Sequence, residues 1–262
     1  MYPLIDIGAN LTHDSFDADR DAVIQRALSA GVERMILTGS SDRASHDAVA
    51  LAEQRRDVFH ATVGVHPHHA SEYDDTVHTR LSALALRPVV AAIGECGLDY
   101  YRDLSPRARQ RFAFERQIEI AIDTQLPLFL HQRDAHADFL AILKPAVSRL
   151  SRGVAHCFTG GVDELQAYLE IGLYIGVTGW ICDERRGTAL REAAPRIPLD
   201  RLMIETDAPY LLPRSLVPKP DSRRNEPMYL REVLRVLAET MHVDEDELAR
   251  ATTANSRRFF GI

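Results

Sequence analysis

The sequence predicts a (β/α)₈ barrel built as a single domain over residues 1–262. Short runs rich in valine, isoleucine and leucine alternate about eight times with longer segments of helical period. The length of 262 residues suits one barrel of this kind. Polar residues that can bind metal follow several of the apolar runs, where barrel enzymes carry their reactive groups. These three observations together favour one fold class.

The predicted strands are near-continuous apolar runs, as expected for parallel strands that are buried on both faces. They are residues 4–7, 34–37, 59–65, 89–94, 128–130, 154–156, 173–177 and 202–205. A doubly wound open sheet is the alternative fold. It predicts a glycine-rich, phosphate-binding turn after the first strand, and the sequence has none there.

Several of the intervening segments have recognisable helix boundaries. Residues 21–30 precede Gly31 and residues 163–171 precede Gly172, and glycine is common just after a helix. Residues 106–125 form a long amphipathic run that begins with proline, a favoured first helical residue. By contrast, the segment 212–227 is rich in proline and arginine and predicts an ordered loop after the last strand. No low-complexity linker divides the chain, so one domain is expected.

Composition limits the classes of protein that the chain can belong to. The formal net charge is −7, which argues against a protein that coats nucleic acid through bulk charge but allows a local basic cleft. Three cysteines, Cys96, Cys157 and Cys182, form no CxxC pair and indicate a reducing compartment. We expect no signal peptide and no membrane span, because the sequence lacks apolar segments of the required length and setting. The cytoplasm is therefore the expected location.

Residues that commonly bind metal recur at the ends of the predicted strands. They are His66 and His68, Glu95, His131, His156 and Asp207. A single histidine or acid in such a place is usually a packed or solvated residue, but recurrence at five strand ends favours a metal site. Imidazole and carboxylate ligands suit Mg²⁺, Mn²⁺ or Zn²⁺.

Strand alternation predicts which of these side chains share a face, since residues two apart point the same way. If Glu95 and His156 point into the barrel mouth, Cys96 and Cys157 point away from it and are packing residues. The same rule predicts three further pairs on shared faces: His66 with His68, Glu205 with Asp207, and Gly8 with Asn10.

Several spaced motifs occur in one order, which is far more specific than any single motif. They are GVHPH at 64–68, IGECGLDY at 93–100, HQR at 131–133, HCFTG at 156–160 and ETDAPY at 205–210. On these motifs the chain resembles the TatD family of metal-dependent nucleases. The resemblance runs nearly end to end, through RRNEP at 223–227 and the tail 255–261.

The resemblance implies a barrel of the metal-dependent hydrolase type and an active phosphodiester hydrolase. The segments 179–187 and 211–227 resemble the members that degrade single-stranded DNA and RNA from the 3′ end. A 3′–5′ exonuclease in DNA repair or nucleic-acid turnover is therefore expected. Its partner is the single-stranded substrate, and we expect a monomer that does not bind membranes.

One position departs from the family pattern. Most members carry a His-x-His pair at the end of the first strand, where this chain has Gly8 and Asn10. Glycine cannot bind metal and an asparagine oxygen is a weak neutral ligand, so one metal position is weakened or lost. Glu95, His131, His156 and Asp207 remain as expected ligands of one ion. With fewer imidazoles we expect Mg²⁺, with Mn²⁺ or Zn²⁺ as alternatives.

Other residues have expected roles in catalysis and in substrate binding. Asp207 is also the candidate general base, while His66 and His68 are candidates to stabilise the phosphate or protonate the leaving oxygen. Five arginines are predicted to bind substrate phosphates, although for each an ordinary ion pair is the competing interpretation. They are Arg133, Arg185, Arg186, Arg223 and Arg224.

Two other functions fit parts of the sequence. A metal-dependent amidohydrolase or ester hydrolase uses similar strand-end ligands, but it has no need of arginines around the mouth. A non-catalytic barrel that serves as a partner in protein-export quality control is favoured only by the missing His-x-His pair. The presence of the other metal-binding residues argues against it.

Overall fold

The computed structural model describes residues 2–262 and contains one eight-stranded sheet in the order β1–β8. The strands are β1 (Leu4–Ala9), β2 (Val32–Leu37), β3 (Phe59–Val63), β4 (Val90–Asp99), β5 (Leu128–Arg133), β6 (Gly153–Ala155), β7 (Tyr174–Val177) and β8 (Leu202–Ile204). A parallel bridge between Ala9 and Ala208 links the ends of β1 and β8. The predicted (β/α)₈ barrel is confirmed.

Helices follow the strands along the chain, and several begin at side-chain caps. They are α1 (Arg20–Ser29), α2 (Asp42–Gln54), α3 (Asp75–Ala85), α4 (Arg107–Thr124), α5 (His136–Leu143), α6 (Val162–Glu170), α7 (Thr188–Ala193), α8 (Leu230–Met241) and α9 (Glu245–Phe260). Ser41, Asp74 and Asp244 accept hydrogen bonds from backbone N–H groups in the first turns of α2, α3 and α9. None of the helices within residues 2–262 is long and apolar enough to cross a membrane.

The chain divides into two compact units. Unit 1 runs to Ile36 and resumes over Cys157–Glu170 and Tyr174–Ile262. Unit 2 contains Leu37–His156 and Ile171–Leu173. The single domain over residues 1–262 stays a prediction.

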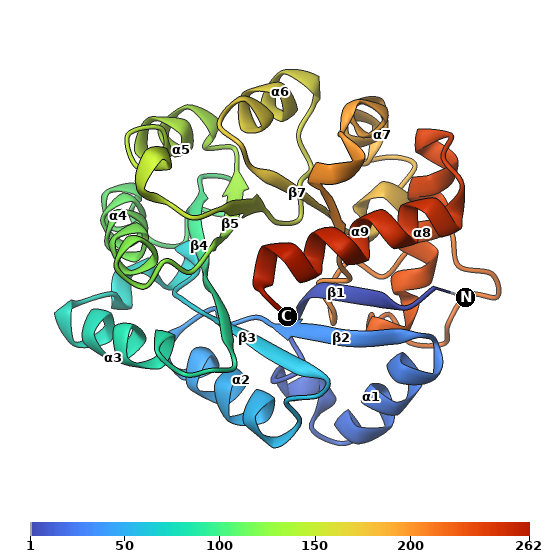
Figure 1. Ribbon diagram of the computed structural model, residues 1–262, viewed down its shortest axis with the longest axis horizontal. Coiled ribbons are helices and arrows are strands. Elements are labelled where there is room, and N and C mark those ends of the chain that lie inside the picture. Colours follow the sequence, from blue (N-terminus) through green and yellow to red (C-terminus); the bar gives the residue numbers. More distant parts are fainter. Residues whose placement is uncertain (1) are drawn as a thin grey trace. The chain divides into compact units, whose positions relative to one another are not determined.

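In unit 2, strand β4 lies between β3 and β5 and is buried along its whole length. Two glycines let β4 run close to β5. Gly94 and Gly97 have φ angles of 138° and 140°, and a Cβ atom at either would collide with a carbonyl oxygen of β5. Helices α2, α3 and α4 lie outside these strands (Figure 1). The close approach of the two strands brings polar side chains at their carboxyl ends together.

In unit 1, the first and last strands pair directly. The N–H of Asp207 donates to the Gly8 carbonyl at 2.8 Å, and the N–H of Asn10 donates to the Ala208 carbonyl at 2.7 Å. Helix α9 packs against both β1 and β8, so the two ends of the chain share one core (Figure 1). Residues between β8 and the 3₁₀ turn Pro227–Tyr229 form no helix or strand, and the predicted irregular loop is confirmed.

The local differences from the predictions have simple causes. Strand β4 continues to Asp99, because Gly94 and Gly97 let it keep its pairing with β5 past the predicted end at residue 94. His66 and His68 do not lie on a strand, since β3 ends at Val63 and a 3₁₀ helix spans Pro67–Glu72. Pro106 caps helix α4 instead of being its first residue, with an extended ψ of 135°.

Candidate active site

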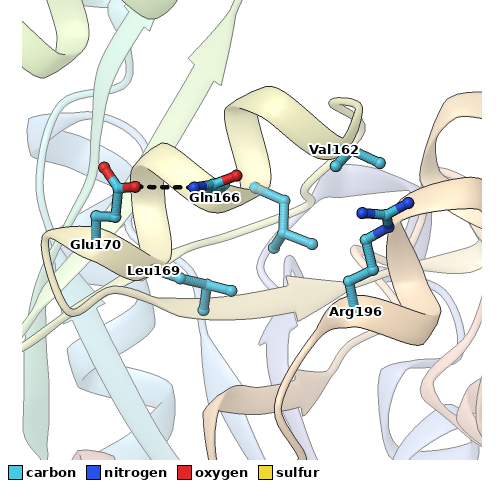
Figure 2. A pocket seen from close by; sticks show the side chains of 6 residues that line it. Val162, Gln166, Leu169, Glu170 and Arg196 are labelled. Carbon is cyan, nitrogen blue, oxygen red and sulfur yellow. Dashed lines mark hydrogen bonds between the residues drawn. The ribbon is translucent and has the colours of Figure 1, made fainter.

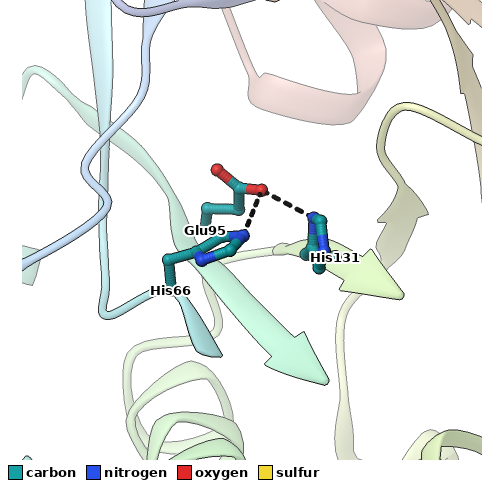
Figure 3. Close-up of side chains that lie close together, drawn as sticks. All are labelled: His66, Glu95 and His131. Carbon is teal, nitrogen blue, oxygen red and sulfur yellow. Dashed lines mark ion pairs between the residues drawn. The ribbon is translucent and has the colours of Figure 1, made fainter. Parts of the chain in front are cut away.

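The most concentrated group of chemically reactive side chains in unit 2 surrounds Glu95 of β4. Its Oε1 atom lies 3.0 Å from His131 Nδ1, 3.1 Å from His156 Nε2 and 3.4 Å from His66 Nε2. Figure 3 shows Glu95, His66 and His131 pointing toward one another. One carboxylate oxygen therefore faces three imidazole nitrogens at close range.

Each of these side chains is positioned by a strand of unit 2 or by the turn that follows it. His131 lies on β5 and pairs in register with Gly97 of β4, two residues beyond Glu95. His156 follows β6 directly, and its N–H donates to the Leu130 carbonyl of β5 at 2.9 Å. His66 caps the 3₁₀ helix after β3, where its Nδ1 accepts a hydrogen bond from the His68 N–H at 3.1 Å.

The surroundings of Glu95 keep it ionised. Burial alone would raise its pKa, but His66, His156 and His131 outweigh that effect and hold the pKa well below its usual range. Burial also lowers the pKa of His66 well below its ordinary value, so this ring is neutral near pH 7. Desolvation would lower the pKa of His131, but Asp99 and Glu95 outweigh that effect and raise it. A buried anion among imidazoles is an arrangement suited to a cation.

Hydrogen bonding indicates which ring nitrogens of His66 and His131 are available to a metal ion. Because His66 Nδ1 accepts from the His68 N–H, its proton must sit on Nε2, the atom that faces Glu95. A protonated nitrogen cannot bind metal, so His66 is a hydrogen-bond donor in this arrangement. In His131, Nδ1 lies 3.0 Å from Glu95 Oε1 and Nε2 lies 3.5 Å from the Asp99 carboxylate, so a cation bound at Nδ1 would leave the proton on the nitrogen that faces Asp99.

The donor set fits a divalent cation. One atom each of His66, Glu95 and His131 lies within 4.8 Å of the others, although the proton on His66 Nε2 makes that nitrogen a hydrogen-bond donor and not a ligand. His156 Nε2 reaches the same Glu95 oxygen. In addition, His131 Nε2 is buried and makes no hydrogen bond within the described residues, and the Asp99 carboxylate lies 3.5 Å from it. Glu95, His131 and His156 are thus the residues that fit the ion.

Asp99 joins this cluster although the sequence reasoning did not select it. Its Oδ2 accepts from His68 Nε2 at 2.8 Å, and its side chain is almost completely buried. Burial alone would raise its pKa, but His131, His68 and the Arg102 N–H hold the pKa well below the usual value. The missed signal was strand alternation, because Asp99 lies four residues after Glu95 and so on the same face of β4.

Asp207 lies in unit 1, next to the positions where the family histidines are replaced. Asn10 Nδ2 donates to Asp207 Oδ1 at 3.1 Å. The φ angle of Asp207 is 55°, in the left-handed region, so the strand alternation predicted to pair it with Glu205 ends before it. Glu205 instead accepts a hydrogen bond from the Cys157 N–H at 2.5 Å. Asn10 thus contacts the predicted catalytic carboxylate through its amide nitrogen.

A second acidic residue of unit 1, Asp6, is fully buried in the middle of β1. It accepts hydrogen bonds from the Thr206 hydroxyl at 2.5 Å, the Thr206 N–H at 2.9 Å and the Gly8 N–H at 3.2 Å. Burial nevertheless raises the pKa of Asp6 to about 7, against the effect of these hydrogen bonds. This carboxyl group ties β1 to the segment after β8.

Of the five predicted phosphate-binding arginines, Arg133 is the one in unit 2. Its guanidinium lies 3.8 Å from the ring centroid of Tyr101, a side chain that is 60% exposed. The Tyr101 N–H donates to Asp99 Oδ1 at 3.1 Å, which places this aromatic ring on the turn directly after β4. The stacked pair therefore lies beside the histidine cluster of the same unit.

The four remaining arginines belong to unit 1. Arg186 pairs with Asp183 at 2.7 Å and stacks on Trp180 at 4.5 Å. Arg185 and Arg223 are exposed. The structure therefore assigns these three to the surface of unit 1, and their phosphate contacts stay predictions.

Arg224 has a different environment from its neighbour Arg223. It donates to both oxygens of Asp19, at 2.8 and 2.7 Å, and to Glu226 at 2.9 Å. A further bond reaches the Ser15 carbonyl at 2.6 Å, and the guanidinium covers the ring of Phe16. The pKa of Asp19 falls to about 2, chiefly because Arg224 donates to it. These contacts fit an anchor for the loop, the competing interpretation of the sequence.

A surface pocket of about 400 Å³ lies elsewhere in unit 1, beside α6 (Figure 2). Its lining consists of Val162, Leu165, Gln166, Leu169, Glu170 and Arg196, and Gln166 donates to Glu170 at 3.1 Å. These six residues include no histidine and one carboxylate. The pocket therefore lacks the groups that metal-dependent hydrolysis needs.

Comparisons with known proteins agree with this geometry. The family described as "TatD related DNase" matches residues 5–261. The chain is 49% identical over 259 residues to the 3′-5′ ssDNA/RNA exonuclease TatD of Pantoea ananatis, covering 99% of this chain and all of that protein. Identity to the protein of the same name from Citrobacter rodentium is 51% over 259 residues, covering 99% of this chain and 98% of that one.

Solved structures give the same result. YJJV, a TatD homolog from Escherichia coli k12, is 30% identical with a TM-score of 0.90 and covers 99% of this chain and 98% of its own. A phosphotriesterase homology protein from Escherichia coli, with phosphate in its active site, is 13% identical with a TM-score of 0.67, covering 99% of this chain and 98% of its own. That likeness extends to the fold alone. With the profile match and the identity over the whole chain, the protein belongs to the family of TatD-related DNases.

Proposed function

We propose that this protein is a metal-dependent 3′–5′ exonuclease that hydrolyses phosphodiester bonds of single-stranded DNA and RNA. The observation that carries the proposal is the buried Glu95 oxygen, which faces His131 at 3.0 Å and His156 at 3.1 Å. The names of the relatives that are about half identical over the full length supply the substrate and the direction.

The proposed ligands are Glu95, His131, His156 and Asp207, as the sequence predicts. A divalent cation at this site would neutralise charge on the scissile phosphate and make the attacking water more acidic. We propose Mg²⁺, with Mn²⁺ and Zn²⁺ as the alternatives that two imidazole ligands allow.

The protein's own groups have separate proposed tasks. His66 carries its proton on Nε2, so it can donate to a phosphate oxygen without changing its tautomer. His68 is partly exposed and hydrogen-bonded to Asp99, which suits a group that passes a proton to the leaving oxygen. Asp207 is proposed as the general base, held through its Oδ1 by Asn10.

Substrate binding is proposed for Arg133 and its stacked partner Tyr101. An arginine that lies flat on an aromatic ring keeps its N–H groups in plane and available to a phosphate. The uncovered face of an exposed tyrosine can stack on an unpaired base, which every nucleotide offers. Arg185, Arg186 and Arg223 are proposed as further phosphate contacts. Arg224 stays a prediction in this role, and its ion pairs favour the anchoring role.

The test uses purified protein stripped of metal with a chelator. Single-stranded DNA and RNA labelled at the 3′ or the 5′ end are incubated with Mg²⁺, Mn²⁺ or Zn²⁺, beside a blunt duplex of the same sequence. Early release of the 3′ label from single strands, restored by added metal, is the expected result. A single strand should be cleaved faster than the duplex, because an end must be unpaired before it enters the site.

Other results would redirect the proposal. Equal rates on duplex and single strand, or first release of the 5′ label, would contradict it. Absence of cleavage with each of the three metals would favour the non-catalytic alternative. We also propose a monomer in the cytoplasm acting in DNA repair or nucleic-acid turnover, and three cysteines that form no disulfide bond agree with a reducing compartment.

A further inference from the structure

The short segment that joins β3 to His66 is held by polar side chains of unit 2. Strand β3 ends at Val63, so Gly64 and Val65 lie beyond its ladder with β4, yet both are buried. Buried backbone N–H and C=O groups need hydrogen-bond partners. Ser45 of α2 supplies them for Gly64, because its Oγ accepts from the Gly64 N–H and donates to the Gly64 carbonyl, both at 3.0 Å.

Gln117 of α4 supplies the partners for Val65. Its Oε1 accepts from the Val65 N–H at 2.7 Å, and its Nε2 donates to the Val65 carbonyl at 3.1 Å. The same Nε2 donates to the Ala113 carbonyl within α4 at 3.0 Å, which fixes the orientation of the amide. Gln117 is 0% exposed, so water does not compete for these hydrogen bonds. The side-chain amide thus pairs with Val65 as a neighbouring strand would.

The peptide bond between Val65 and His66 is therefore held at both of its polar atoms. Gln117 donates to its carbonyl oxygen, while its N–H, which belongs to His66, donates to the Ser40 carbonyl at 2.9 Å. Because a peptide unit is planar, holding both atoms fixes the direction in which the His66 side chain leaves the backbone. The Nε2 atom of that ring lies 3.4 Å from Glu95 Oε1 (Figure 3).

Helix α4 makes the same kind of contact a second time. Gln110 lies seven residues before Gln117 and so on the same face of the helix. Its Oε1 accepts from the Asp99 N–H at 2.8 Å, and its Nε2 donates to the Asp99 carbonyl at 3.2 Å. One face of α4 therefore holds the chain at two points beside the histidine cluster, just after β3 and at the end of β4.

We propose that Gln117 is a positioning residue that fixes the place of the His66 ring beside Glu95. This inference rests on the proposed function, in which His66 donates to a phosphate oxygen. Without the amide, the peptide bond between Val65 and His66 is free to rotate, and the ring moves with it. A displacement of about 1 Å in a reacting group can reduce turnover about 100-fold.

The substitution Gln117→Met tests this role, because methionine has nearly the same length and makes neither hydrogen bond. We expect kcat on a 3′-labelled single strand to fall about 100-fold with KM unchanged, since the other phosphate contacts still bind the substrate. A second measurement requires neither metal nor turnover. In metal-free protein, the carbon–proton correlation signals of the His66 ring should shift in Gln117→Met.

Asn255→Leu is the matched control. Asn255 is also buried, and its amide donates to the Leu199 and Leu202 carbonyls of unit 1 at 2.7 and 2.8 Å. The control therefore removes buried hydrogen bonds of the same kind, outside the unit that contains the cluster. Both variants should have a lower free energy of unfolding than the wild type. Only Gln117→Met should change kcat and the His66 ring signals.

The outcomes separate this inference from the proposed function. Unchanged kcat and unchanged His66 signals in a folded Gln117→Met protein would overturn the positioning role, even if the wild type cleaves DNA. Equal losses of kcat in Gln117→Met and Asn255→Leu would also overturn it, because a general loss of stability would then explain both. If the wild type does not cleave, the proposed function fails and the ring signals alone decide the inference.

Hydrogen exchange in the wild type decides the case in which Gln117→Met does not fold. Protection of the Val65 N–H like that of the amides paired within the sheet would support the inference. Exchange of the Val65 N–H as fast as that of an exposed amide would overturn it.

Discussion

Asp6 of unit 1 and Asp99 of unit 2 are both buried aspartates on strands, and their surroundings move their pKa values in opposite directions. Burial raises the pKa of Asp6 to about 7 although three N–H and O–H groups donate to it. Burial also acts on Asp99, but two histidines and a backbone N–H lower its pKa. Neutral donors are therefore weaker than imidazoles at keeping a buried carboxylate charged.

The difference indicates what each carboxylate does. Asp99 and Glu95 stay ionised among rings that can accept a positive charge, as expected of groups that organise a cation site. Asp6 sits among a hydroxyl and amides, where it links β1 to Thr206 and gains no cationic neighbour. The following experiments test that separation between a chemical role and a structural one.

The largest effect is expected for Glu95→Gln, which removes the charge at the centre of the cluster. We expect kcat/KM to fall by more than about 100-fold, since losing an outer-shell partner alone costs 10- to 100-fold. Cleavage of a 3′-labelled single strand at limiting Mg²⁺ measures it, and the exposed Glu115→Gln is the control. Turnover near the wild-type rate would remove Glu95 from the proposed ligands.

The second effect concerns Asp6 and the dependence of stability on pH. Its pKa in the folded protein is about 7 against an ordinary value of 3.8. The unfolded chain therefore loses its proton first, and the stability that protonated Asp6 contributes below pH 4 declines until pH 7. The free energy of unfolding is expected to decline by about 1.4 kcal/mol per pH unit in that window.

Urea unfolding of the wild type and Asp6→Asn between pH 5 and pH 8 measures this decline. The free energy of unfolding of the wild type minus that of Asp6→Asn should fall as pH rises to 7 and then level off. A difference that does not change with pH would mean that Asp6 is ionised in the folded protein, as Asp99 is.

A smaller change in stability is expected for Arg224→Ala. The substitution leaves Asp19 and Glu226 with Arg26 as their remaining cation. Because these groups are partly exposed, we expect the free energy of unfolding to drop by roughly 1–3 kcal/mol. Arg223→Ala is the matched control and should leave stability unchanged. Equal stability of both variants would contradict an anchoring role for Arg224.

The smallest effect is expected for Arg223→Ala on catalysis. An exposed phosphate contact that is equal in the ground and transition states raises KM and leaves kcat unchanged. The salt dependence of binding should weaken by about one phosphate contact. Arg250→Ala, on the exposed surface of α9, controls for the loss of one positive charge. A lower kcat at an unchanged KM would instead make Arg223 a support for the active site.

Strand periodicity was enough to predict the barrel, because buried parallel strands leave continuous apolar runs in the sequence. It was also enough to group Glu95 with His131 and His156, which the structure brings to one carboxylate oxygen. Their roles as ligands stay predictions. His66 and His68 were grouped for the wrong reason, since a 3₁₀ turn and not a strand brings their rings to 4.1 Å.

Other features depend on contacts that sequence spacing does not encode. Arg223 and Arg224 are identical neighbours in the sequence, and only the fold reveals that Arg224 meets Asp19 from about 200 residues away. The backbone of Asp207 is in the left-handed region, so strand alternation cannot predict which way its side chain points. Strand alternation from Glu95 could have predicted the face of β4 on which Asp99 lies. Its contacts with His68 and His131, which come from other segments, could not be predicted in this way.

The pairing of β1 with β8 has a consequence for the order in which the protein folds during synthesis. Residues up to Ile36 belong to a unit whose other members begin at Cys157, so β1 has no partner in β8 until the ribosome has made residues 202–204. Closing so long a loop is entropically costly and slows folding. The stretch Leu37–His156 contains Glu95, Asp99 and all four histidines of the cluster. The residues of the cluster around Glu95 are therefore all synthesised before β8, the partner of β1, has been made.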